Sequence, residues 1–151
     1  MPPRLCRTLS PAAGSHGHGG EMATLKVTEE NFDATVKQGI VVLDFWAAWC
    51  GPCRAFAPVF EAASERHADV VFGKVDTEAD PGLAAAFEIR AIPTLMVLRE
   101  GVLLGVFPGM MPAARLDELV RKVRVIDMDD VRRQLDEAQQ KTPRAAKAGG
   151  A

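Results

Sequence analysis

The chain has 151 residues, of which 48% are hydrophobic and 25% are charged, and its formal net charge is −2. This length and balance are typical of one soluble globular domain. The weak net charge gives no field to attract phosphate or anionic lipid, and no apolar run approaches the roughly 20 residues that span a bilayer. We therefore expect no nucleic-acid and no membrane partner.

The first 21 residues contain Pro, Gly, Ser and His without periodicity, which predicts a disordered N-terminal lead over residues 1–21. The lead carries Cys6, for which we expect no redox role. Arg4 and Arg7 occur there without a continuous apolar segment, so it is not a secretory signal, although a transit-like segment stays open. Three cysteines are too few for a disulfide-stapled secreted scaffold, which favours a reducing cytoplasm.

An ordered domain is predicted over residues 22–125. It begins with a strand from Leu25 to Val27 and a helix from an N-cap at Thr28 to Gln38, ended by Gly39. The other predicted elements follow in chain order: a strand over 40–46 buried on both faces, a helix over 53–66 kinked by Pro58, a strand over 70–75, a helix over 81–87 capped by Asp80, a hairpin of 94–98 and 102–107, and an amphipathic helix over 112–125. This alternation predicts an α/β fold, a mixed central sheet with helices on both faces. Residues 126–151 predict a helical extension and a flexible tail.

Two cysteines stand three residues apart where the strand over 40–46 turns into the next helix. Gly51 and Pro52 separate Cys50 from Cys53. Unpaired N–H groups and the dipole at a helix N-terminus favour a thiolate, which lowers the pKa of a thiol there by about one unit. We expect an exposed Cys50 to attack a substrate disulfide and an inward-facing Cys53 to resolve the mixed disulfide.

One carboxylate interrupts the strand over 40–46. Asp44 has apolar neighbours on both faces of that strand, so burial should raise its pKa and suit it to accept the proton of Cys53. Lys74, on the neighbouring predicted strand, is placed to moderate this shift. A solvated lysine at a strand end fits Lys74 equally well, and an edge-strand surface charge is the less favoured alternative for Asp44.

The same residues allow a different interpretation. A C-x-x-C pair can form half of a zinc site, but two further ligands would have to come from the remaining cysteine and the histidines: Cys6, His16, His18 and His67. The intervening Gly51 and Pro52, and the lack of a second C-x-x-C, disfavour zinc. Trp49 fits either core packing or a docking surface beside the thiols, and we favour docking.

Three segments carry a resemblance to a known family. They are D-F-W-A-A-W-C-G-P-C over 44–53 with Pro58 in the next helix, I-R-A-I-P-T-L over 89–95, and Gly109. The chain resembles the thioredoxins over residues 22–125. The resemblance implies a cis Pro93 facing the cysteines, an active-site loop of Trp49, Gly51 and Pro52 tuned by Lys74, and a substrate-binding surface of five residues: Trp49, Ile92, Pro93, Thr94 and Gly109.

The Gly51-Pro52 pair resembles the reducing members of that family. This implies a monomeric, cytoplasmic protein-disulfide reductase without a bound cofactor, supplied with electrons from NADPH by a thioredoxin reductase and acting on disulfide-containing proteins. Three features depart from the family: an apolar loop over 108–112, a lead without the paired zinc motifs of one subgroup, and the extension after Val125. The alternative function is a redox-gated binding module that uses the thioredoxin surface and the C-terminal helix.

Overall fold

A computed structural model describes residues 23–141 of the chain. The predicted lead with Cys6, His16 and His18, and the tail after Lys141, lie outside the described residues. Within residues 23–141, no helix combines the length and the apolar character needed to cross a bilayer.

The described chain is built around one five-stranded sheet. Its strands are β1 (Thr24–Val27), β2 (Ile40–Trp46), β3 (Val70–Asp76), β4 (Thr94–Arg99) and β5 (Val102–Pro108). They lie in the order β1-β3-β2-β4-β5. β3 is parallel to β1 and β2, whereas β4 is antiparallel to β2 and β5 to β4. The predicted mixed sheet is confirmed, and β2 lies at its centre.

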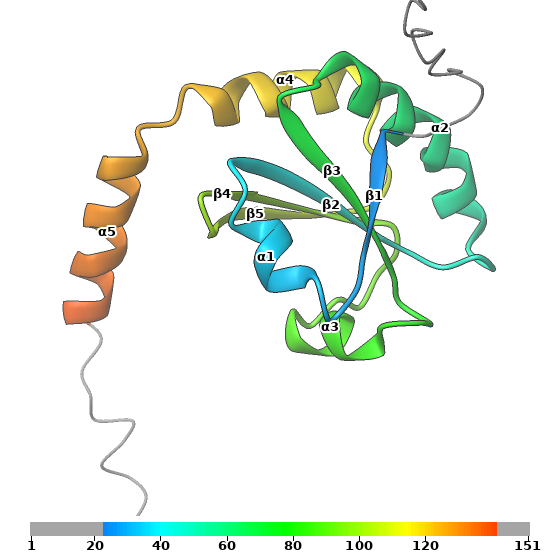
Figure 1. The fold of residues 1–151 in the computed structure, drawn as a ribbon, viewed down its shortest axis with the longest axis horizontal. Coiled ribbons are helices and arrows are strands. Elements are labelled where there is room, and N and C mark those ends of the chain that lie inside the picture. The colour runs from blue at the N-terminus through cyan, green and yellow to red at the C-terminus, as the bar shows by residue number, and fades with distance from the viewer. Residues whose placement is uncertain (1–22, 142–151) are drawn as a thin grey trace, which may run out of the picture.

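Helices cover both faces of the sheet, as predicted. The helices are α1 (Phe32–Val36), α2 (Gly51–Arg66), α3 (Pro81–Ala86), α4 (Ala113–Arg124) and α5 (Met128–Lys141). Residues of α2 and α4 pack together in one apolar cluster, while residues of α1 and α3 contribute to a second. Figure 1 shows α2 and α4 along one side of the sheet and α1 and α3 on the other.

β2 is buried on both faces of the sheet. Val42 contributes to the cluster under α2 and α4, and Val41 and Leu43 contribute to the cluster under α1 and α3. A β-branched strand that is apolar on both faces is typical of the middle of such a sheet. The strand ends at Trp46, directly before the turn that carries the cysteines.

The first helix is shorter than predicted. It begins at Phe32 after Asn31, and the prediction of an N-cap at Thr28 is wrong. The Thr28 N–H donates to Asn31 Oδ1 over 2.8 Å, and the Asn31 N–H donates to Thr28 Oγ1 over 3.4 Å. These reciprocal bonds close one turn with the pattern of a capping box, directly before the helix begins at Phe32.

Asp80 also differs from its predicted role. It stands at the N-cap position of α3 but makes no side-chain capping bond there. Its Oδ1 accepts a hydrogen bond from the Glu29 N–H over 3.1 Å instead, because the turn before α1 lies beside the start of α3. The side chain therefore joins two loops rather than capping a helix.

The predicted helical extension is present as α5. Met128 at its start is buried, and Arg132 forms an ion pair with Glu100 in the β4–β5 turn over 3.1 Å. Arg99 Nη1 donates to the carbonyls of Val123 and Ile126 over 2.8 and 2.9 Å, which satisfies acceptors at the end of α4. The first turn of α5 is thus fixed to the sheet.

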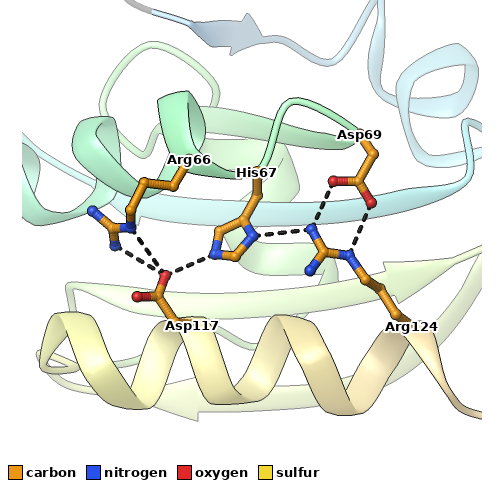
Figure 2. A network of polar contacts seen from close by, with 5 residues as sticks. All are labelled: Arg66, His67, Asp69, Asp117 and Arg124. Carbon is orange, nitrogen blue, oxygen red and sulfur yellow. Dashed lines mark hydrogen bonds and ion pairs between the residues drawn. The ribbon is translucent and has the colours of Figure 1, made fainter.

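A polar network joins the end of α2 to α4 (Figure 2). Asp117 Oδ1 lies 2.9 Å from Arg66 Nη2 and 2.7 Å from His67 Nε2. Arg124 Nη2 lies 2.9 Å from His67 Nδ1, and its guanidinium also bonds Asp69. Because a guanidinium can only donate, His67 Nδ1 is the acceptor and Nε2–H donates to Asp117. We call these five residues the helix-joining network.

Candidate active site

Cys50 and Cys53 form a disulfide at the N-terminus of α2, with Cα atoms 5.2 Å apart. Cys50 is the N-cap in an extended conformation, and Pro52 lies in the first turn of the helix. The Cys53 N–H points to Cys50 Sγ over 3.2 Å. When the bond is reduced, this N–H and the helix dipole favour negative charge on the Cys50 sulfur.

The structure corrects one expectation about this pair. Cys50 was expected to be exposed, but in the disulfide it is only 4% exposed, and Cys53 is 2% exposed. Both sulfur-bearing residues pack in a small cluster with Ala47, against which Trp46 and Ile92 also lie. The segment before Pro93, far along the chain, supplies much of this cover.

The Ile92–Pro93 peptide bond is cis, as the resemblance implied. The Ile92 carbonyl oxygen lies 3.6 Å from Cys50 Sγ, a position in which a reduced thiol could donate to it. The Pro93 carbonyl accepts from the Gly109 N–H over 2.8 Å, and Gly109 has φ +90°. Ile92, Pro93 and Gly109 are therefore brought together beside the disulfide, although they come from two separate loops.

Thr94 directly follows the cis proline and begins β4. It is 2% exposed, and its hydroxyl donates to the Ala91 carbonyl over 2.5 Å. The side chain is directed into the protein because it closes the turn before β4. The Thr94 hydroxyl thereby holds the turn that contains the cis proline.

Trp49 extends from the turn between β2 and α2. Its side chain is 68% exposed, which excludes the core-packing alternative. The indole N–H donates to Glu78 Oε1 over 2.6 Å, and this bond fixes the ring beside the disulfide. Sequence reasoning missed Glu78, because a lone glutamate in the turn after β3 carries no local signal for a partner 29 residues away.

Asp44 lies under the active site in the middle of β2. It is fully buried, and neither carboxyl oxygen has a hydrogen-bond partner in the described part of the chain. Burial raises the pKa of Asp44 from 3.8 to about 7, and the charge of Lys74 opposes this rise. The alternative of a surface charge on an edge strand is excluded, because β2 pairs on both sides.

Lys74 lies opposite Asp44 in the β2–β3 register. Its side chain is 20% exposed, with Nζ 4.8 Å from the centre of the Trp46 ring and 3.9 Å from Glu61 Oε1. The open, solvated lysine that the sequence also allowed does not fit these contacts. Glu61 was missed by sequence reasoning, because it comes from the middle of α2.

A depression of about 410 Å³ borders this lysine at the β1 edge of the sheet. Its walls come from three neighbouring strands, and its lining residues are Thr24, Leu25, Lys26, Trp46, Lys74 and Asp76. One side of Lys74 thus faces a surface hollow, while its strand neighbour Asp44 is buried.

The zinc alternative finds no donor set within residues 23–141. No group of three or more His, Cys, Asp or Glu side chains in this range is placed to hold a metal ion. His67 lies in the helix-joining network, and the two cysteines are bonded to each other. The other candidate ligands lie outside the described residues.

A vicinal cysteine pair at a helix N-terminus, beside a cis-proline turn and above a buried carboxyl group, defines a thiol–disulfide oxidoreductase. The family model described as Thioredoxin matches residues 23–122. The chain belongs to the thioredoxin family.

Individual relatives agree with this assignment. A putative thioredoxin 2 from Streptomyces coelicolor is 52% identical over 118 residues, covering 78% of this chain and 88% of the relative. A thioredoxin from Staphylococcus haemolyticus is 40% identical over 104 residues, covering 67% of this chain and 98% of the relative. Among solved structures, a mutant thioredoxin from Halobacterium salinarum is 27% identical, with a TM-score of 0.65 over 72% of this chain and 97% of that chain.

Proposed function

We propose that this thiol–disulfide oxidoreductase works in the reducing direction on protein disulfides, with Cys50 as nucleophile and Cys53 as resolving thiol. The Cys50 thiolate attacks a substrate disulfide, which forms a mixed disulfide and releases one substrate thiolate. The Cys53 thiolate then attacks Cys50 Sγ, which restores the Cys50–Cys53 disulfide and releases the second substrate thiol. The substrate gains two electrons and the cysteine pair loses two.

Asp44 is the proton acceptor for Cys53 in this scheme. A buried carboxyl with a pKa of about 7 exists in both protonation states near neutral pH, which suits a group that takes and returns a proton. The transfer is direct or passes through one water molecule. Lys74 limits the rise of this pKa, so the carboxylate remains available as a base.

Substrate docking is assigned to the residues around the disulfide. Trp49 offers a large exposed ring, and Ile92 beside the cis Pro93 offers backbone groups to an extended segment. Gly109 lacks a side chain where its loop meets Pro93, so a partner can approach closely. Gly51 and Pro52 separate the two cysteines, and we assign them to tuning of the redox pair.

We further propose that a thioredoxin reductase returns the pair to its dithiol form with electrons from NADPH, and that the protein works in the cytoplasm. The thioredoxin names of the relatives and the Gly51-Pro52 dipeptide support this placement. No cofactor of its own is needed in this scheme, because the electrons reside in the two sulfur atoms.

The disulfide at the N-terminus of α2 carries the proposal, and insulin reduction tests it. With a bacterial thioredoxin reductase and NADPH, we expect NADPH oxidation and insulin precipitation that Cys50→Ser abolishes. A redox titration should give a potential near −270 mV, as is general for reducing members, rather than near −120 mV, as in strongly oxidising relatives. Full turnover in Cys50→Ser, or a potential in the oxidising range, would overturn the proposal.

A further inference from the structure

The ammonium group of Lys74 interacts electrostatically with two carboxyl groups, those of Asp44 and Glu61. Asp44 lies opposite it on β2, and the charge of Lys74 acts on that carboxyl group. Glu61 reaches over from α2 and places Oε1 3.9 Å from Nζ. The ring of Trp46 lies on the same side, 4.8 Å from Nζ. The lysine is therefore shared between a buried acid and a partly exposed one.

Few other charged side chains lie near Lys74 and Asp44. The ionisable and charged groups on the elements around Lys74 are Asp44 on β2, Asp76 on β3, Lys26 on β1, and Cys53, Arg54, Glu61, Glu65 and Arg66 on α2. On α2, Arg54 and Glu65 are exposed, and Arg66 pairs with Asp117. Lys26 and Asp76 line the surface depression with Lys74, where water screens them. On β4, the residue opposite Asp44 is the apolar Leu95. Lys74 is thus the cation through which a neighbour can influence Asp44.

We propose that Glu61 is a positioning residue for the redox reaction: it holds the Lys74 ammonium toward α2 and so limits the positive charge that reaches Asp44. This inference rests on the proposed role of Asp44 as proton acceptor. An opposite charge kept close to a carboxylate favours its ionised form. If Lys74 paired with Asp44 alone, the pKa of Asp44 would be lower, and its carboxylate would accept the proton of Cys53 less readily near neutral pH.

The test is the titration of Asp44 in the oxidised full-length protein, followed by carbon-13 NMR of its carboxyl group. Glu61→Gln keeps the shape of the side chain and removes its charge. We expect the titration midpoint to fall by about half a pH unit or more, because Lys74 is then left with Asp44 as its carboxylate partner. Lys74→Met should move the midpoint in the opposite direction, to higher pH.

A matched control separates this effect from a general change of charge on α2. Glu65 lies one turn further along the same helix, is exposed, and has no ion pair among residues 23–141. Glu65→Gln should leave the midpoint unchanged. Circular dichroism should show that each variant is folded. Glu61→Asp, which shortens the side chain but keeps its charge, should give a smaller shift in the same direction as Glu61→Gln.

The double variant decides whether Glu61 acts through Lys74. In the Lys74→Met background, Glu61→Gln should produce less than half of the shift that it produces alone. An equal shift in both backgrounds would show that Glu61 acts by its own field and would overturn the proposal, as would an unchanged midpoint in folded Glu61→Gln. The titration needs no substrate, so this failure differs from a failure of the proposed function, which would appear as lost insulin reduction.

Discussion

The backbone N–H of Gly109 donates to the carbonyl of Pro93 over 2.8 Å. This hydrogen bond joins the loop after β5 to the cis-proline turn before β4. Both segments lie beside the disulfide. Gly109 has φ +90°, a backbone conformation that residues other than glycine rarely adopt. Nothing lies within 4 Å of the position where a Cβ atom would stand. The conformation, rather than lack of space, requires glycine here.

Gly109→Ala should therefore reduce insulin reduction and also lower the free energy of unfolding by about 1–3 kcal/mol. Gly101→Ala is the matched control, because Gly101 has φ +79° with equally open surroundings in the β4–β5 turn. We expect similar destabilisation from both variants in urea denaturation, but a loss of kcat/KM only from Gly109→Ala. An equal loss of kcat/KM from both would mean that general destabilisation, not the active-site loop, limits activity.

Asp44→Asn should stabilise the oxidised protein at alkaline pH. Because the folded pKa of about 7 lies above the ordinary value of 3.8, the folded protein binds this proton more tightly, and stability falls as pH rises from about 4 to 7. Removing the charge should recover up to about 4 kcal/mol at pH 8 and almost nothing at pH 4. Urea denaturation at the two pH values measures the difference. An equal gain at both would assign the effect to packing rather than to ionisation.

Cys53→Ser should trap substrate on the protein. Cys50 can still attack a disulfide, but the thiol that resolves the mixed disulfide has been removed, and residues 23–141 contain no other cysteine. Mass spectrometry under non-reducing conditions should show a covalent adduct with insulin chains that dithiothreitol releases. Cys50→Ser should form no such adduct, and an adduct at Cys53 of that variant would reverse the roles assigned to the two cysteines.

The helix-joining network should contribute measurably to stability. Asp117→Ala leaves Arg66 and His67 without their shared acceptor, and we expect unfolding to become easier by about 1–2 kcal/mol. A double-mutant cycle with His67→Ala should show a coupling energy of at least about 0.5 kcal/mol. Glu118→Ala, on the neighbouring exposed position, should leave the melting temperature almost unchanged. Strict additivity of Asp117→Ala and His67→Ala would show that their contact carries no energy.

The sequence predicted those features that depend on local pattern. β2 was predicted with its observed bounds because its apolar residues occupy both faces, and the same pattern marked Asp44 as buried. The predicted start of α1 was wrong by three residues, because the reciprocal bonds of Thr28 and Asn31 close a separate turn and the helix begins only after Asn31.

Residues that act across the fold were harder to predict. Glu61 and Glu78 look like ordinary surface acids in the sequence, and their partners become neighbours only when α2 and β3 are packed. The near-complete burial of Cys50 has the same origin, since Ile92 covers it from 42 residues away. Local chemistry identified the reacting groups, whereas tertiary contacts decided what surrounds them.

The position of α5 has a practical consequence for how the molecule meets its partners. α5 and the turn between β2 and α2 lie at opposite sides of the described chain (Figure 1). A protein that bound both α5 and the turn between β2 and α2 would have to extend across the full width of the sheet. Attachment to a surface through the C-terminal side would accordingly leave the turn between β2 and α2 on the far side of the molecule, where a large macromolecule can reach it.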